Sequence, residues 1–176
     1  SPILEMVLNL NAEWNLISGI DDMIPFYSII DPDGIVIPNT LFGFEVTYVN
    51  SGIMIPGRGY WIRTLEEGEI TLSSGVSAKS ESKDYSLKGK ANTLSINGLE
   101  LYFGVEMAPR DRLSYSLPPK PPVGAFDVRF KNGWRLAKDY GEIELMNTGK
   151  TLTIVYDIKL RLGKLHNWVL RSEDGT

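Results

Sequence analysis

The 176-residue chain contains no cysteine and a single histidine, His166. The lack of cysteine excludes disulfides, thiolate nucleophiles, cysteine-ligated zinc and iron–sulfur clusters. One histidine cannot supply a zinc site built from two or three imidazoles. No G-x-S-x-G motif accompanies His166, so a serine-hydrolase triad is not indicated. We interpret His166 as a surface or edge-strand residue.

Phosphate-binding motifs, excess positive charge and long apolar runs are missing as well. Neither G-x-x-x-x-G-K-[ST] nor G-x-G-x-x-G occurs, and the net charge is −4, which argues against nucleic acid as a partner. No apolar run approaches the roughly 20 residues that span a bilayer, and the chain does not start with a basic and then apolar leader. We expect no enzyme activity, no cofactor, no nucleic-acid partner and no membrane insertion.

What the sequence has in abundance is short alternating stretches separated by turn residues, with 17 glycines and 10 prolines. Alternation of apolar and polar residues is typical of half-buried strands. In the first half we expect strands at 7–11, 14–17, 35–37, 41–50, 60–64 and 69–73, with a helical turn at 23–29. This pattern predicts an all-β fold.

The second half repeats the pattern. Asn97-Gly98 is a strong hairpin signal between strands at 93–96 and 99–103, and Asn132-Gly133 follows an alternating strand at 125–130. Further strands are expected at 142–145, 151–156 and 168–170. The four prolines of Ser116–Pro122 exclude a central strand there. Strands with turns every 8–12 residues indicate an immunoglobulin- or fibronectin-like sandwich.

The composition changes at residues 74–84, which are rich in serine, lysine and acidic residues and therefore resemble a linker. We expect two small modules, a short-strand β repeat module at 1–75 and a β-sandwich module at 85–176. A single continuous sandwich is the alternative. Asp174-Gly175 is a hairpin signal with no strand after it, which indicates either a truncated chain or a strand supplied by another chain.

Aromatic side chains are the candidate ligand-binding residues, because sugar rings stack on exposed aromatic faces. The candidates are Tyr60, Trp61, Trp134 and Tyr140, with Trp168 as a further one. Tyr60 and Trp61 are neighbours on one strand, so they point to opposite faces. The competing interpretation places the tryptophans in the cores, Trp14 with Trp61 and Trp134 with Trp168, because a large ring buries much apolar area.

Acidic side chains give weaker signals. Asp31 and Asp33 with Gly34 resemble part of a calcium loop, but position twelve of such a loop is Phe42 instead of glutamate. We interpret Asp31–Gly34 as a turn, with calcium held by backbone carbonyls as the alternative. Glu142 and Glu144 lie on one face of a strand and are interpreted as a solvated face instead of a glycosidase pair.

Two stretches resemble known bacterial modules. Leu8–Ser18, Ile30–Pro38 and Pro56–Arg63 resemble a repeat of large secreted bacterial proteins with the pattern G-W-N-L-I-S followed by P-G-x-G-Y-W. Glu13 and Asn39 stand where such repeats often have glycine. Gly98–Val105 and Tyr115–Phe130 resemble the β-sandwich region before the sorting domain of type IX secretion substrates.

The resemblance implies a secreted or surface-anchored bacterial protein, so we expect an extracellular or cell-surface location. The expected function is that of a non-catalytic module, a spacer, stalk or adhesive element whose partners are neighbouring domains of the parent chain. The alternative is a carbohydrate-binding module attached to a polysaccharide-degrading enzyme, with polysaccharide as the partner.

Overall fold

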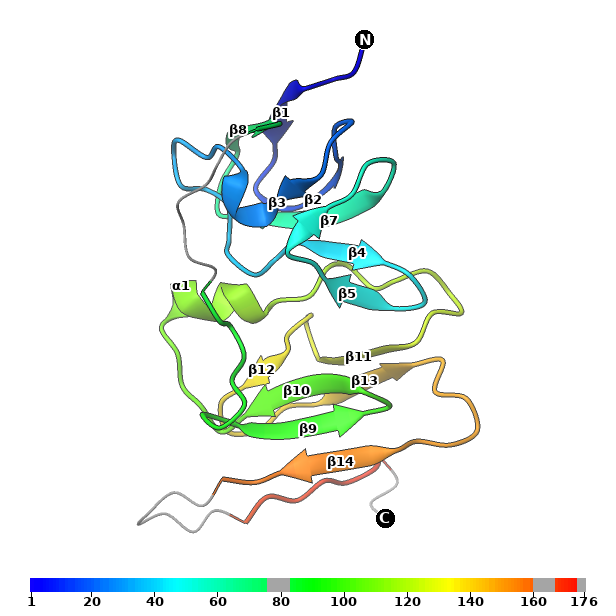
Figure 1. Cartoon of the computed structure of the whole chain (residues 1–176). Helices are drawn as coiled ribbons and strands as arrows, with labels where there is room; N and C mark the ends of the chain where they lie inside the picture. The colour runs from blue at the N-terminus through cyan, green and yellow to red at the C-terminus, as the bar shows by residue number, and fades with distance from the viewer. Residues whose placement is uncertain (76–82, 160–166, 174–176) are drawn as a thin grey trace.

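The computed structural model describes residues 1–75, 83–159 and 167–173, and these residues form an all-β protein. The helical elements are single turns: η1 (Phe26–Ser28), α1 (Pro109–Arg112) and η2 (Leu113–Tyr115). Within the described ranges no helix is both long and apolar enough to cross a membrane. Figure 1 shows two groups of strands stacked end to end, which we call the first module (β1–β8) and the second module (β9–β14 with the segment 167–173).

The first module contains three small antiparallel sheets. Their strands are β1 (Glu5–Leu10), β2 (Glu13–Ser18), β3 (Ile24–Pro25), β4 (Phe42–Phe44), β5 (Tyr48–Asn50), β6 (Ile53–Met54), β7 (Gly59–Thr64) and β8 (Gly68–Ser73). Strand β1 pairs with β8, β3 pairs with β6, and the largest sheet has the order β2-β7-β4-β5. The expected alternation at 7–11, 14–17, 60–64 and 69–73 is therefore confirmed as strand.

A cluster of buried, mostly aliphatic side chains forms the core of the first module. Ile62, Ile70 and Leu72 are fully buried, although they come from two different sheets. The other buried members of this cluster are Leu10, Ile17, Ile20, Ile24, Ile35, Leu41, Met54 and Tyr60. Alternation explains the pattern, because successive side chains of a strand point to opposite faces and only one face meets the core.

The second module contains two sheets. Its strands are β9 (Asn92–Ile96), β10 (Leu99–Phe103), β11 (Asp127–Phe130), β12 (Leu136–Ala137), β13 (Ile143–Met146) and β14 (Ile154–Asp157). One sheet has four strands in the order β12-β10-β9-β14, and the other pairs β11 with β13. Leu94, Ile96 and Leu101 of the first sheet form one cluster with Val128 and Phe130 of the second. Side chains of two facing sheets thus share one core, which is the arrangement of a β-sandwich.

The predicted turns agree closely with the backbone. Asn97 (φ 47°) and Gly98 (φ 88°) both lie in the left-handed region, as a two-residue hairpin turn between β9 and β10 requires. Asn132 (φ 66°) and Gly133 (φ 79°) repeat this geometry. The signal is reliable because it depends on the conformation of two adjacent residues only.

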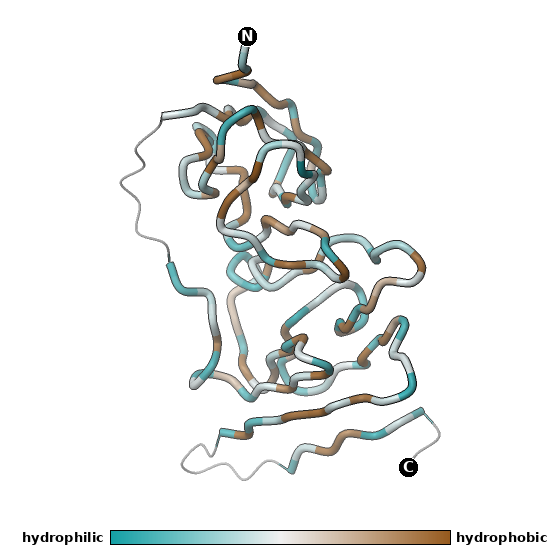
Figure 2. Tube along the Cα trace, turned by 45° about the vertical axis from the view of Figure 1, so that its right-hand side comes forward, coloured by the Kyte–Doolittle hydropathy of each residue, from teal (hydrophilic) through white to brown (hydrophobic). Residues whose placement is uncertain are grey.

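Some expected strands are wrong. Ile35–Ile37 forms only an isolated bridge, Val36 with Thr64, because its backbone serves a turn stabilised by Asp31. Trp168–Leu170 has no strand pairing, although it runs beside β14 in Figures 1 and 2. Most of the expected linker, residues 76–82, lies outside the described residues, as do His166 and Asp174-Gly175.

Candidate functional site: an apolar groove and the seam between the modules

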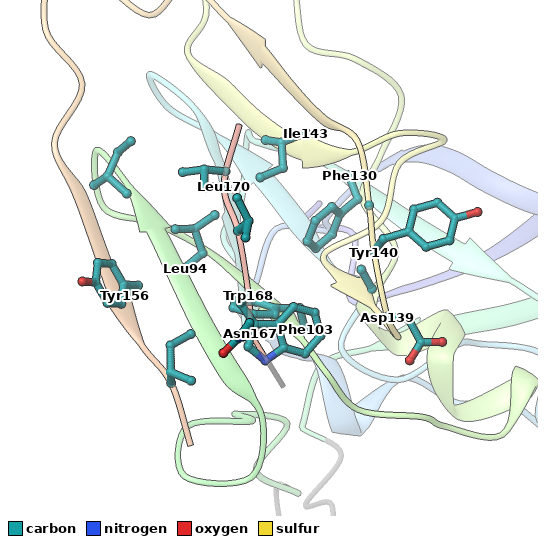
Figure 3. A pocket seen from close by; sticks show the side chains of 15 residues that line it. Leu94, Phe103, Phe130, Asp139, Tyr140, Ile143, Tyr156, Asn167, Trp168 and Leu170 are labelled. Atoms are coloured by element: carbon teal, nitrogen blue, oxygen red, sulfur yellow. The ribbon is translucent and has the colours of Figure 1, made fainter. Parts of the chain in front are cut away.

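An open groove lies at the edge of the second module (Figure 3). It occupies about 870 Å³ between the two sheets of the sandwich. Apolar side chains of β9, β10, β11, β13 and β14 form most of its wall, among them Leu94, Phe103, Phe130, Ile143 and Ile154. The groove exists because one sheet has four strands and the facing sheet has two, so the edge of the core is left without a strand above it.

The segment Asn167–Glu173 partly fills this groove. The ring of Trp168 meets that of Phe103 edge-on, with centroids 4.8 Å apart, as Figure 3 shows. Gly104 permits this approach, because a Cβ atom there would lie 3.0 Å from the Trp168 ring and 2.5 Å from the amide of Asn92. Val169 and Leu170 stay largely exposed, so the segment covers the core without closing it.

The groove suits apolar contact rather than bond chemistry. Its polar side chains are Asp139, Tyr140, Tyr156 and Asn167. Figure 3 shows Asp139 and Tyr140 at the rim and Tyr156 on the far side beyond Leu94. Across residues 1–75, 83–159 and 167–173, histidine and acidic side chains form no group of three that could hold a metal ion. An arrangement of this kind can hold apolar side chains of another segment.

A second feature is the seam where the two modules meet. The guanidinium of Arg63 lies 5.8 Å from the ring of Trp14 and 5.9 Å from that of Trp134, and Arg112 lies 4.2 Å from Trp134. We call these four residues the Arg–Trp stack. Two of them belong to each module, so the stack joins the modules by cation–π contacts.

The electrostatic setting of Arg63 fits this structural role. Burial lowers the pKa of the Arg63 guanidinium from its ordinary value, and Glu13, at 3.6 Å, partly opposes the shift. The charge remains at neutral pH because an arginine pKa is far above 7. A second link crosses the seam nearby, since the amide of Asn39 donates a hydrogen bond of 2.8 Å to the carbonyl of Ser114.

A buried ion pair lies beneath the seam. Arg129 and Asp127 are two residues apart on β11, so their side chains share the face opposite the sandwich core. The guanidinium of Arg129 donates to both Asp127 oxygens, and its Nη1 donates at 2.7 Å to the carbonyl of Pro118. Burial raises the pKa of the facing Tyr48 hydroxyl, and the hydrogen bond from Trp61 opposes that shift. All polar groups of the ion pair are thus satisfied.

The structure separates the predicted aromatic residues instead of grouping them. Tyr60 is buried in the first core, where its hydroxyl accepts a 2.9 Å hydrogen bond from the Ile55 N–H. Trp61 is half-buried on the opposite face, as the alternation predicted. Tyr60 is therefore corrected from candidate ligand residue to core residue, because its ring has no accessible face.

Trp134 and Tyr140 differ in the same way. Trp134 is half-buried, and two guanidinium groups lie over its ring, which leaves little room for a stacked sugar. Tyr140 is 93% exposed at the rim of the groove. The predicted tryptophan core placement holds only in part: Trp14, Trp61, Trp134 and Trp168 are all half-buried, and Trp134 packs against the edge of the second core. Each sits at a boundary where one ring edge meets a polar partner or solvent.

Asp31 and Asp33 form a turn. The Asp31 oxygens accept hydrogen bonds from the backbone N–H groups of Ile35 (3.0 Å) and Val36 (2.9 Å), and Asp33 points into solvent. Gly34 has φ 66°, which the turn requires. Because both Asp31 oxygens are engaged in the turn, this carboxylate is poorly placed to act as a cation ligand.

Sequence reasoning did not find Arg63, Asp127 or Arg129. Arg112 was interpreted with Arg110 and Asp111 as a solvated loop ion cluster, with a carboxylate-binding fork as the alternative, whereas its guanidinium lies over the Trp134 ring. The buried ion pair had a local signal, since opposite charges two residues apart within an otherwise apolar strand share one face. The Arg–Trp stack had none, because Arg63 and Trp134 come together only when the modules dock.

Comparison of the chain with models of protein families, with curated proteins and with solved structures finds no match.

Proposed function

We propose that the chain is a non-catalytic module of a larger secreted or surface-anchored bacterial protein, in which it acts as a rigid spacer. The observation that carries the proposal is the end-to-end arrangement of the modules. The first residues and the segment 167–173 lie at opposite ends of the molecule in Figure 1, so domains attached there are held apart. The extracellular setting is proposed from the resemblance to secreted bacterial modules.

Rigidity is supported by the seam. The Arg–Trp stack and the Asn39–Ser114 hydrogen bond each restrain the two modules. A non-catalytic role is supported by how charged side chains are used. Lys131 pairs with Glu142 (2.8 Å), Lys138 with Glu106 (2.9 Å) and Lys120 with Glu144 (3.2 Å), each as a separate surface contact.

The apolar groove of the second module is where we expect a neighbouring domain of the parent chain to pack. Apolar side chains of an adjoining domain of the parent chain would cover Phe103, Trp168 and the exposed faces of β14. Figure 2 shows hydrophobic stretches along β14 and the segment beside it, at the end of the molecule remote from the N-terminus. Aromatic stacking of a polysaccharide is a weaker candidate, because Tyr140 stands apart from the other predicted rings.

The spacer proposal is tested by measuring the distance between the modules. The chain has no cysteine, so spin labels can be attached only where cysteines are introduced, at the exposed positions Glu66→Cys and Val123→Cys. Pulsed electron resonance should give one narrow distance distribution. Arg63→Ala should broaden it, because the stack is lost. Arg58→Ala, which removes only an exposed ion pair with Glu45, should leave it narrow. A broad distribution in the otherwise unchanged protein contradicts a rigid spacer.

A further inference from the structure

A separate polar groove crosses the seam on the side of Arg135. It has a volume of about 540 Å³ and is bordered by Asn39 and Asn50 of the first module and by Tyr102, Tyr115 and Arg135 of the second. Small-molecule sites typically occupy roughly 300–1,000 Å³. The groove is therefore large enough for a short oligosaccharide.

Arg135 is held in a fixed position on its wall. Its backbone N–H donates a 2.8 Å hydrogen bond to the carbonyl of Tyr115, and its own carbonyl accepts one of 2.8 Å from the N–H of Tyr102. The guanidinium lies 5.8 Å from the Tyr102 ring centroid. The backbone bonds fix where the side chain starts, and the contact with the Tyr102 ring restrains the guanidinium itself, which reduces the entropy lost on binding.

The guanidinium of Arg135 has no carboxylate partner within salt-bridge distance in residues 1–75, 83–159 and 167–173, and there it donates no hydrogen bond. The negative charge of Glu100 is already engaged, since its oxygens bind Lys88 Nζ at 2.7 Å and the Tyr102 hydroxyl at 3.2 Å. Burial lowers the pKa of Arg135, and Tyr102 and Glu100 oppose that shift. Because Glu100 also pairs with Lys88, it neutralises the partly desolvated Arg135 only in part, and a bound anion would add to that stabilisation.

Charged groups line the groove beside Arg135, the cations Lys83 and Lys88 and the carboxylates Asp84 and Glu100, so its cations outnumber its carboxylates by one. Neutral hydrogen-bonding groups complete the lining. The amide nitrogens of Asn39 and Asn50 donate within the protein, to Ser114 and to Asn39 carbonyls at 2.8 Å, so their amide oxygens remain for a ligand. The Tyr115 hydroxyl also has no hydrogen-bond partner among the described residues. Amide oxygens and a phenol beside one guanidinium match a ligand that carries a carboxylate on a polyhydroxylated body.

We propose that this groove binds an acidic saccharide, with Arg135 gripping the carboxylate of a uronic-acid residue and the amide oxygens of Asn39 and Asn50 accepting from its hydroxyls. A planar guanidinium can bind a carboxylate through two parallel hydrogen bonds. The site uses no aromatic stacking. It develops the carbohydrate-binding alternative and does not depend on the spacer role, which the distance measurement tests separately.

The experiment is calorimetric titration of the whole chain with trigalacturonate and with a glucuronate-containing trisaccharide. We expect one of them to bind, and we expect its carboxyl-reduced, neutral counterpart to bind at least tenfold more weakly. Arg135→Gln should weaken binding by a similar factor. Arg110→Gln, which removes an exposed arginine outside the groove, should leave the affinity unchanged.

A second readout does not require a variant that folds. In the unaltered protein, the side-chain Nε–H resonance of Arg135 should shift on addition of the acidic trisaccharide and stay in place with the neutral one. Binding of neither acidic trisaccharide, equal binding of acidic and neutral forms, or tighter binding of a triglutamate peptide overturns the proposal. Loss of binding in Arg110→Gln would overturn the placement at Arg135.

Discussion

The two modules close their cores to different degrees. In the first module Ile62, Ile70 and Leu72 have no measurable exposure. At the edge of this core the buried Thr64 is satisfied, because its Oγ1 donates a 2.7 Å hydrogen bond to the carbonyl of Asn11. In the second module the core divides into two clusters, and every residue of β14 is exposed. Short strands thus form a fully enclosed core in the first module and a partly open core in the second.

The difference comes from the number of strands on each side of the core. Strands of three sheets contribute side chains to the first core, so it is enclosed from several directions. In the second module β11 and β13 face four strands and cannot reach across them. A sandwich with unequal sheets therefore depends on additional contacts, here the irregular segment Asn167–Glu173 and the buried ion pair of β11. Changes in those segments should harm the second module alone.

The largest expected effect is that of Asp127→Ala. Removal of the carboxylate leaves Arg129 buried without a counter-charge, and breaking a buried pair in this way costs about 3–5 kcal/mol. Urea unfolding should show this loss. Hydrogen exchange should place it in β9–β13 and leave β1, β7 and β8 protected.

The matched control is Glu142→Ala, directly before the partner strand β13, which removes an exposed ion pair with Lys131 and should not change the unfolding midpoint. Equal loss of protection in both modules after Asp127→Ala would show that the cores do not differ in the way described.

An intermediate effect is expected for Trp168→Ala. The ring is half-buried against Phe103, so its removal should cost about 1–2 kcal/mol, less than for a fully buried tryptophan. Calorimetry should show a lower unfolding temperature, and exchange should quicken in β9 and β10 first. Val169→Ala, which changes an exposed neighbour, serves as the control. Indistinguishable results for the two variants would mean that the segment does not support the core.

Features set by neighbouring residues could be predicted from the sequence, whereas contacts between residues far apart in the chain could not. Turns were predicted well, because left-handed backbone at Asn97-Gly98 is a property of adjacent residues. The all-β class followed from alternation, which is local too. Tryptophan placement was predicted only in part, because area burial favours a core position, whereas Trp134 packs against the edge of the second core and also meets Arg63 of the other module. Only the docked structure makes that contact visible.

One local signal was underestimated. Glu13 and Asn39 occupy positions where the resembled repeat often has glycine. Both have left-handed backbone, Glu13 at φ 74° and Asn39 at φ 62°. This conformation costs a residue with a Cβ atom about 1–2 kcal/mol, with asparagine the better tolerated, which is the physical reason why glycine is frequent at such positions.

The smallest expected effect is a gain at Glu13. Glu13→Gly should stabilise the protein by about 0.5–1 kcal/mol, since relief of backbone strain outweighs the greater freedom of glycine in the unfolded chain. The lost contact with Arg63 spans 3.6 Å and involves a largely exposed carboxylate, so it contributes little.

Asn39→Gly is the matched comparison, because it relieves the same strain but removes the hydrogen bond to Ser114 across the seam. We therefore expect the unfolding temperature to rise in Glu13→Gly and to stay unchanged in Asn39→Gly. A fall in stability for Glu13→Gly would mean that its contact with Arg63 holds the Arg–Trp stack together, and that the sealed first module depends on the seam as much as the open second module does.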